Sequence, residues 1–570
     1  MPSVPTAPAT AKTKDEKKKD AHPRDPAREA IETIVFVVVL VLLLKLFVTE
    51  AFVIPTGSMA ETLYGYQKLV TCPKCGHEFP VNSHDEVEPN NQTKQLHQLL
   101  GYCCPNCRHR GEIKDLNPVP GNRTGDRVLV LKPLYHLAAP QRGDVVVFKF
   151  PKEPQQKWSA QNYIKRAMAF GGETIAVHRG ELFVTRSLEY PADLRDENGE
   201  IIYPRPDDPN DLWKARYMYS SPNYRNPLAT NLFESSRIKG FPDDGVGFTI
   251  VRSTNDQVLA RKRIVWDNDH QPTTGPAALV PARWSPEAKD KWKGDTPQQT
   301  KAFAHAAEEL DWLRYRHLVW DWVSDPASVT PRPIDNFLGY NNGTSHRDPS
   351  GKLAMTDVKG EDKWVGDLII ECEAEIAGGA EVVLELSRGA SRFQAKFADG
   401  KVTLARTGDR AGEMASRPTK VKAGGKHKLR FANVDARLRV WVDERVIDFG
   451  KDGDYSPTEP PQPTAAGHGP DPEGWVKEND IDAPASVGAK GAVTIRSLKL
   501  FRDVYYTRWV PYSDHTTAET YYVQPGHYLC LGDNSASSSD SRDWGLVPER
   551  LMLGKAVFVF FPWGRLGFIK

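Results

Sequence analysis

Phe52-Val-Ile-Pro-Thr-Gly-Ser-Met59 is the stretch around which the rest of this chain can be interpreted. Pro55 and Gly57 favour a tight turn, and a turn at this point would present the hydroxyl of Ser58. A presented serine is a candidate nucleophile, although Pro, Thr, Gly and Ser together also describe an ordinary loop. The segments on either side of this stretch decide between the two interpretations.

A strongly apolar run precedes the stretch, with Ile34 to Leu44 unbroken by a polar residue. We predict a transmembrane helix over residues 31–50, after a disordered tail over residues 1–30 that contains seven Lys or Arg residues. These positive charges place the N-terminus in the cytoplasm and the rest of the chain outside it. A cleavable signal peptide is the alternative, because Thr49-Glu-Ala51 resembles a small-x-small cleavage site.

Length and composition favour several β-rich domains. The chain has 570 residues, 44 prolines and 43 glycines, and its apolar residues often alternate with polar ones. Its formal net charge of +1 gives no sign of a nucleic-acid partner. We therefore expect a mainly β protein that does not bind nucleic acid.

Cysteines gather in one short region, where five of the seven lie between Cys72 and Cys107. Two Cys-Pro-x-Cys pairs, Cys72 with Cys75 and Cys104 with Cys107, have the spacing of a four-thiolate zinc ribbon. A pair of disulfides is the alternative, since these residues are predicted to lie outside the cytoplasm. A closed zinc site of this kind would be structural and would leave no open position for catalysis.

Strand patterns begin after this region. They comprise Gly125-Asp-Arg-Val-Leu-Val-Leu131, Arg142-Gly-Asp-Val-Val-Val-Phe-Lys-Phe-Pro151 and Asn162-Tyr-Ile-Lys-Arg-Ala-Met-Ala169. Within the last strand, Lys165 and Arg166 must point to opposite faces. A lysine in an apolar pocket loses its proton easily and can act as a general base, whereas an arginine stays charged. The alternative is two solvated cations on an exposed strand.

Near the C-terminus the chain contains Gly532-Asp-Asn-Ser-Ala-Ser-Ser-Ser-Asp-Ser-Arg-Asp-Trp-Gly545. Such a composition is typical of a flexible loop. An apolar segment before it and Trp544 within it also allow an ordered network of hydroxyl groups and an Asp–Arg pair.

Together these segments resemble type I signal peptidase, a membrane-bound serine protease. Four blocks in family order carry the resemblance: Ile54-Pro-Thr-Gly-Ser-Met59; Gly125-Asp-Arg-Val-Leu-Val130; Arg142 to Phe148 with Tyr163-Ile-Lys-Arg166; and Gly532-Asp-Asn534 with Ser538-x-Asp-Ser-Arg542. The resemblance implies a discontinuous β core over residues 51–71, 122–185 and 503–570. A zinc-ribbon-like insert over residues 72–121 interrupts this core.

The resemblance also implies roles for individual residues. Ser58 would be the nucleophile and Lys165 the general base, with Thr56 and the Ser58 N–H group holding the oxyanion. Ser538 would position the lysine, and Asp533, Asp540 and Arg542 would form the supporting network. This chemistry needs no cofactor.

A large insert separates the last strand block from the C-terminal block. We predict an irregular segment over residues 186–359, with a helix near residues 299–323 where apolar residues recur at helical spacing. Residues 360–502 contain short alternating strands, which predict a β-sandwich that resembles the concanavalin-like jelly rolls. Its partner could be a glycan or a protein.

The sequence thus predicts a single-pass enzyme of the bacterial cytoplasmic (inner) membrane that removes signal peptides from exported preproteins at the outer face of the bilayer. The resemblance implies cleavage after small residues. The alternative is a membrane-anchored glycan-binding protein whose protease core is degenerate.

Overall fold

The computed structural model describes residues 26–570 except 90–94, 152–160, 189–225, 244, 296–299, 321–324, 348, 350, 352, 354–362, 409, 422–424, 458–476 and 508–517. The chain divides into two compact units, residues 1–50 and residues 51–570. Most of the predicted disordered tail lies outside the described residues.

The first unit contains α1 (Pro26–Leu43), which leads into a short π-helix, η1 (Leu44–Val48). Arg28, Glu29 and Glu32 lie in the first turns of α1, and the chain becomes extended from Thr49. Among the described residues, the structure has no helix with both the length and the apolar character needed to cross a bilayer. The transmembrane helix predicted over residues 31–50 is therefore not found.

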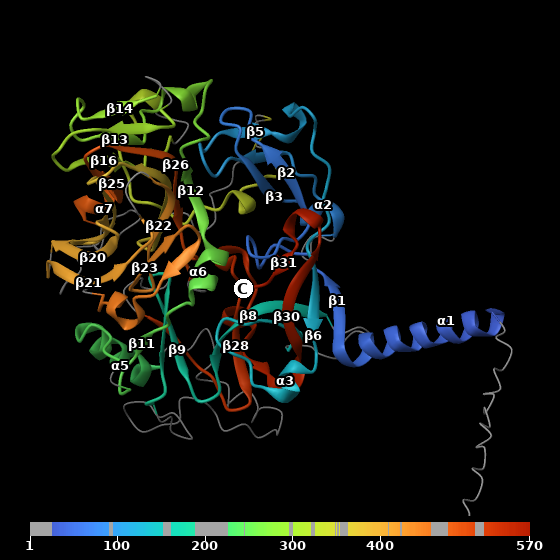
Figure 1. The fold of residues 1–570 in the computed structure, drawn as a ribbon. Coiled ribbons are helices and arrows are strands. Elements are labelled where there is room, and N and C mark those ends of the chain that lie inside the picture. The colour runs from blue at the N-terminus through green and yellow to red at the C-terminus, as the bar shows by residue number, and fades with distance from the viewer. Residues whose placement is uncertain are drawn as a thin grey trace, which may run out of the picture. The chain divides into compact units, whose positions relative to one another are not determined.

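Two antiparallel sheets form what we call the two-sheet core (Figure 1). The larger is eight-stranded, with strands in the order β1 (Thr49–Val53), β6 (Arg127–Leu131), β30 (Met552–Phe561), β7 (Val145–Lys149), β8 (Asn162–Phe170), β28 (His527–Leu531) and β29 (Val547–Pro548), and with β31 (Gly567–Phe568) beside β30. The smaller has the order β11 (Thr249–Ile250), β10 (Glu181–Thr185), β9 (Thr174–His178) and β27 (Glu519–Tyr522). Segments from both ends of the second unit thus meet in one sheet.

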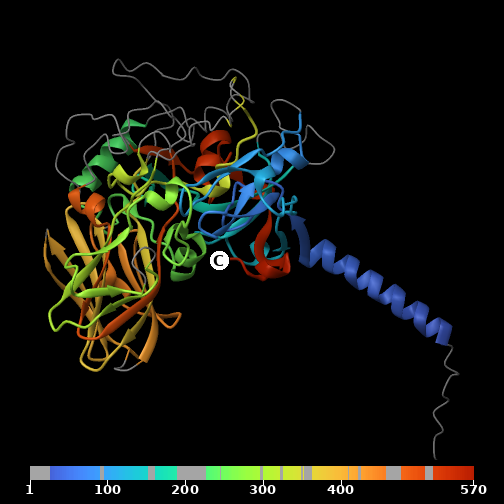
Figure 2. The same cartoon turned by 90° about the horizontal axis from the view of Figure 1, so that it is seen from above.

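Two further sheets enclose the largest hydrophobic core and form the sandwich (Figure 2). One has the order β14 (Trp292–Gly294), β15 (Phe303–His305), β26 (Val493–Arg502), β17 (Leu368–Ile376), β22 (Gly425–Val434), β23 (Arg437–Val442) and β24 (Arg445–Ile447), with β12 (Arg263–Asp267) beside β26. The other has the order β13 (Trp284–Pro286), β16 (Asp311–Tyr315), β25 (Ala485–Lys490), β18 (Glu381–Arg388), β19 (Ser391–Ala398), β20 (Lys401–Gly408) and β21 (Gly412–Pro418). Alternating burial along β19 and β20 shows why these sequences form strands that cover a core on one face. The mainly β class is confirmed.

The prediction of a helix near residues 299–323 is wrong. Within this region the described residues form β15 and β16, and both strands join the sandwich sheets. Buried side chains alternate along β16, at Asp311, Leu313 and Tyr315. Two short strands separated by a turn brought apolar residues to spacings that resemble those of a helix. The sandwich therefore includes strands from the region predicted to be irregular.

Between β1 and β6 lie two small hairpins, which we call the ribbon. They are β2 (Gln67–Thr71) with β3 (Glu78–Asn82), and β4 (Gly101–Cys103) with β5 (Arg110–Glu112). The other α-helices of the described residues are short: α2 (His84–Val87), α3 (Leu134–Leu137), α5 (Pro227–Ile238), α6 (Asn255–Arg261), α7 (Glu478–Asp482) and α8 (Ser541–Trp544). The 3-10 turns in the same part of the chain are η2 (Ile113–Asp115), η4 (Pro276–Leu279), η5 (Pro326–Ser328), η6 (Gly339–Asn341), η7 (Gly450–Gly453), η8 (Ser535–Ser537), η9 (Glu549–Leu551) and η10 (Trp563–Arg565).

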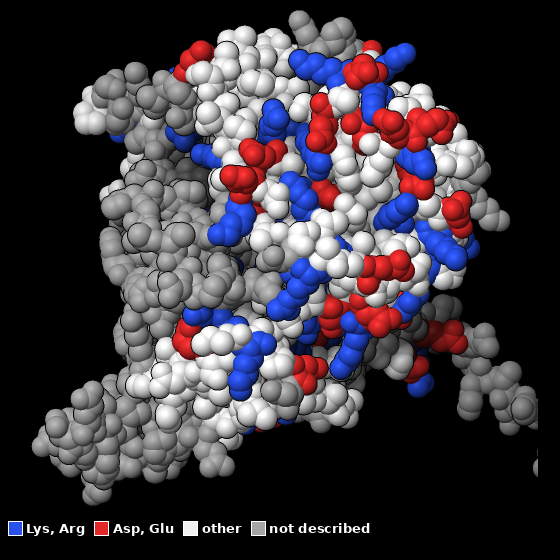
Figure 3. Space-filling model, turned by 90° about the vertical axis from the view of Figure 1, so that its left-hand side faces the viewer, with Lys and Arg blue, Asp and Glu red and all other residues white. Residues whose placement is uncertain are grey.

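Surface charge is mixed on the face shown in Figure 3, where Lys and Arg side chains lie among Asp and Glu side chains. This is the distribution expected for a chain with a formal net charge of +1.

Candidate active site

Ser58 lies in a tight loop between β1 and β2. The loop is closed by hydrogen bonds from the Ala60 N–H to the Gly57 carbonyl (3.0 Å) and from the Tyr66 N–H to the Pro55 carbonyl (3.1 Å). The loop therefore holds Ser58 in a fixed place, and its side chain is directed toward β8.

Lys165 reaches this serine from the middle of β8. Its Nζ atom lies 2.6 Å from the Ser58 Oγ atom and donates a second hydrogen bond to the Ile164 carbonyl at 3.1 Å. The side chain is only 3% exposed. Burial lowers the pKa of Lys165 from its usual 10.5 to about 8, against the opposing effect of the Asp540 carboxylate. About one tenth of the amine is thus neutral at pH 7 and able to accept a proton, compared with less than about one thousandth for an ordinary lysine.

Arg166 points to the opposite face of β8, as strand geometry requires. It is fully buried there, and its Nη2 and Nε atoms bind the Asp533 carboxylate at 2.6 and 2.8 Å. Burial alone would raise the pKa of Asp533, but the adjacent guanidinium group lowers it to about 2. The ion pair joins β8 to the segment that follows β28. Two solvated cations on an exposed strand are therefore not what the structure shows.

Replacing Asp533 by alanine is expected to destabilise the fold by about 3 to 5 kcal/mol, because the buried Arg166 charge would lose the carboxylate that neutralises it. Chemical unfolding of the full chain measures this loss. Asp543→Ala is the matched control, since that carboxylate accepts a hydrogen bond from the exposed Ser539 hydroxyl. A change below about 1 kcal/mol for Asp533→Ala would contradict the role of the ion pair.

Asp540 and Arg542 form a second buried ion pair, with Nη2–Oδ2 and Nε–Oδ1 distances of 2.6 and 2.8 Å. Asp540 also accepts a hydrogen bond from the Gly532 N–H at 2.9 Å, which ties this pair to the segment beside the serine. Burial would raise the pKa of Asp540, but Arg542 lowers it overall. The predicted network around residues 533–542 is thus an ordered assembly in the structure.

The positions of Ser538 and Thr56 do not by themselves show the roles predicted for them. Ser538 is buried close to Gly532, and among the described residues its Oγ atom has no hydrogen-bond partner. The Ser538 hydroxyl therefore makes no hydrogen bond to Lys165 in the structure. Thr56 is exposed, which leaves its hydroxyl open to a bound molecule. The roles of both residues stay predictions.

Part of the chain matches a known protein family. Residues 109–214 and 494–563 match the family described as signal peptidase, peptidase S26. This chain resembles type I signal peptidase. The matched residues contain Lys165 and the network of residues 533–542, whereas Ser58 lies outside them.

Curated signal peptidases support the same resemblance over short stretches. A probable signal peptidase I-1 of Synechocystis is 44% identical over 48 residues, which are 8% of this chain and 24% of that protein. Signal peptidase I of Aquifex aeolicus is 47% identical over 51 residues, which are 9% of this chain and 18% of that protein. The chain therefore spans less than a quarter of the length of these relatives.

Solved structures similar to part of the chain include the carbohydrate-binding module CBM66 of Bacillus subtilis. It is 10% identical and covers 38% of this chain and 95% of its own, with a TM-score of 0.22. Sheep galectin-11 is 14% identical and covers 24% of this chain and 92% of its own, with a TM-score of 0.17. At these scores the likeness says nothing about what the insert binds.

Asn534 is a residue of the signal-peptidase-like site for which no role was predicted. Its Nδ2 atom donates to the Gly57 carbonyl at 2.9 Å, and its N–H donates to the Ser58 carbonyl at 3.1 Å. Its place inside Gly532-Asp-Asn534 was the signal that could have identified it. The residue therefore binds the carbonyls of the two peptide bonds that flank the Cα atom of Ser58.

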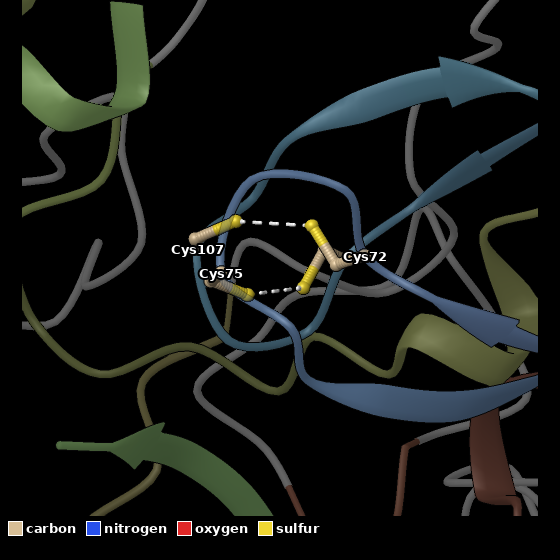
Figure 4. A group of neighbouring side chains, drawn as sticks. Cys72, Cys75 and Cys107 are labelled. Carbon is tan, nitrogen blue, oxygen red and sulfur yellow. Dashed lines mark hydrogen bonds between the residues drawn. The ribbon is translucent and has the colours of Figure 1, made fainter. Parts of the chain in front are cut away.

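The ribbon brings the four predicted metal ligands together, and their sulfur atoms face one another (Figure 4). Sγ–Sγ distances are 3.6 Å between Cys72 and Cys107 and 3.7 Å between Cys75 and Cys104. A disulfide needs about 2.05 Å, whereas thiolates about 2.3 Å from a tetrahedral zinc ion would lie about 3.8 Å apart. The four cysteines therefore fit zinc, and the disulfide alternative is not what the structure shows.

Proposed function

We propose that this chain is a serine endopeptidase that removes signal peptides from exported preproteins by means of a Ser58–Lys165 dyad. One observation carries the proposal: a buried lysine amine lies 2.6 Å from the hydroxyl of a serine in a hydrogen-bonded turn. Similarity to signal peptidases supplies the substrate class.

The proposed reaction follows from the positions of the two side chains. Ser58 Oγ attacks the scissile carbonyl carbon while the neutral Lys165 amine takes the hydroxyl proton. The exposed Thr56 hydroxyl and the Ser58 N–H group stabilise the oxyanion. Lys165 then gives its proton to the leaving amine, and a water molecule activated by the same lysine hydrolyses the acyl-enzyme.

The buried ion pairs behind the dyad support this chemistry. Asp533 with Arg166 ties the segment after β28 to β8, and Asp540 with Arg542 orders that same segment. Rigid support of this kind keeps the reacting groups in position without contact with the substrate. We propose that the reaction takes place at the outer face of the bacterial cytoplasmic membrane, where exported preproteins emerge.

Cleavage of a panel of membrane-inserted preproteins by the purified full chain tests the proposal. We expect one cut per preprotein, after a small residue, as shown by sequencing the N-termini of the products. Failure of the folded chain to cut any member of the panel would overturn the proposed substrate class.

The pH dependence of the reaction follows from the pKa of Lys165. Because burial lowers this pKa to about 8 and only the neutral amine can accept a proton, kcat/KM should rise about tenfold per pH unit below pH 8. It should level off above that value. A profile measured between pH 5 and 10 that falls through pH 8, or shows no inflection there, would contradict the assignment of Lys165 as the base.

A second function is favoured by one cavity. It has a volume of about 570 Å³ and lies between β10 and the sandwich, with Trp364, Phe393 and Arg388 among its lining residues. Aromatic faces beside charged groups suit a hydroxylated ring, which supports a glycan as the ligand of the insert. Calorimetric titration of the full chain with soluble oligosaccharides tests this second function. If none of them gives a heat of binding, glycan binding is contradicted and the peptidase function is the one that stands.

A further inference from the structure

A segment of the large insert reaches the loop that carries Ser58. We call residues 334–344 the arm; it contains η6. The Tyr340 ring is only 1% exposed and packs in one cluster with Ala60, Leu338 and Tyr64. A Cβ atom added at Gly57 would lie 2.2 Å from the Tyr340 Cε1 atom, so only glycine allows this approach. The arm is therefore packed directly against the nucleophile loop.

Polar contacts join the arm to the same loop through Asn534. The side-chain amides of Asn341 and Asn534 exchange two hydrogen bonds, each 2.7 Å long. Asn534 uses its Nδ2 group for the Gly57 carbonyl as well, at 2.9 Å. If the Asn534 amide were turned over, its oxygen would face the Gly57 carbonyl oxygen, and two acceptors would meet. Asn341 thus holds the Asn534 amide in the plane where it can bind the loop.

The arm is anchored at its other end by the ribbon. Arg108 Nη2 lies 2.7 Å from Asp335 Oδ1, and the guanidinium carbon lies 3.5 Å from the centre of the Phe337 ring. Arg108 has a φ of 60°, whereas the equivalent position of the other knuckle is Gly76, with a φ of 72°. Arginine is less favourable than glycine in this left-handed conformation, so its side-chain contacts must offset that cost.

The sandwich holds the arm as well. Arg502, at the end of β26, donates two hydrogen bonds of 2.8 Å from its Nη2 atom to the carbonyls of Asn336 and Phe337. The ribbon and the sandwich therefore both contact the arm at residues 335–337. From there the arm continues to the loop that carries Ser58.

We propose that Asn341 is a positioning residue for the nucleophile, which acts through Asn534 on the Gly57–Ser58 backbone. The large insert thereby completes the support of the active site instead of standing apart from it. This inference rests on the proposed function of the Ser58–Lys165 pair. Among the described residues, the side-chain hydrogen bonds of Asn341 go to Asn534 and none goes to Ser58 or Lys165, so the effect of this side chain passes through Asn534.

A double-mutant cycle on the full chain tests the inference. We expect Asn341→Ala to lower kcat about 10- to 100-fold with little change in KM, because small displacements of a nucleophile slow the chemical step. Asn534→Ala should have an effect at least as large. The double variant should be no worse than Asn534→Ala, since Asn341 acts only through that residue. The inflection of the pH profile should stay near the wild-type value, because the surroundings of Lys165 are unchanged.

Asn342→Ala is the matched control. Its side chain lies in the same turn but donates to the Leu338 carbonyl, at 2.8 Å. We expect kcat within about threefold of wild type for this variant. Additive effects of Asn341→Ala and Asn534→Ala, a kcat for Asn341→Ala within twofold of wild type, or an equal loss in Asn342→Ala would each overturn the inference.

Hydrogen exchange provides a readout that does not depend on activity. Backbone amides in the peptide that covers residues 55–66 should exchange faster in Asn341→Ala than in wild type, and should be unchanged in Asn342→Ala. If the wild type cuts no preprotein but this difference is found, the proposed function fails and the positioning of the loop stands. If exchange is unchanged in Asn341→Ala, the inference fails whatever the activity.

Discussion

Replacement of Lys165 by alanine is expected to lower kcat for preprotein cleavage by at least about 10³-fold, because Ser58 would lose the base that takes its proton. The Nζ atom of this lysine is 2.6 Å from the Ser58 Oγ atom, and the neutral Tyr163 and Cys530 side chains nearby offer no substitute base. Lys165→Arg should be equally inactive, since an arginine keeps its proton at any accessible pH. Steady-state cleavage of one preprotein measures both losses.

Lys149→Ala is the control for this prediction. Lys149 ends the neighbouring strand β7, and its side chain is exposed. The variant should cleave at the wild-type rate. Thermal unfolding must show that Lys165→Ala is folded, because removal of a buried amine also leaves a cavity. A folded Lys165→Ala that cleaves within tenfold of the wild-type rate would contradict the assignment.

We propose that the four cysteines of the ribbon hold a zinc ion, and loss of that ion is expected to have the largest effect on stability. Zinc binding by four thiolates is worth on the order of 10 kcal/mol in small zinc domains, and the two short hairpins bury few apolar side chains of their own. We expect about one zinc ion per wild-type chain. Cys104→Ser should contain far less metal and should unfold at a lower temperature, as measured by metal analysis and calorimetry.

Cys103→Ala is the matched control for metal binding. Cys103 is buried beside the cluster but is not one of its four ligands. This variant should keep its zinc and most of its stability. A wild-type chain purified without metal and with unchanged stability in the presence of a strong chelator would contradict the zinc assignment.

The pairing of Ser58 with Lys165 could be predicted from the resemblance to type I signal peptidase, and the local pattern around each residue agrees with it. Pro55 and Gly57 enforce the turn, and the alternation of β8 sends Lys165 and Arg166 to opposite faces. Alternation alone could not show that both faces of β8 are buried. That depends on β7 and β28, which pair with β8 from distant parts of the chain.

Contacts between the insert and the core could not be predicted in the same way. Asn341 and Asn534 are 193 residues apart, and an asparagine in a loop carries no pattern that names its partner. The same is true of Arg108, whose partner Asp335 lies 227 residues away. The strands β13, β14 and β15 have only three residues each, which is too short for alternation to be recognised.

Cleavage of one preprotein by wild type and by Ser58→Ala, with the product N-terminus sequenced, tests the central claim most directly. The dyad predicts a single cut after a small residue by the wild type and no detectable product from Ser58→Ala, although the two chains unfold at the same temperature. A Ser58→Ala chain that makes the same cut at a comparable rate would show that this serine is not the nucleophile.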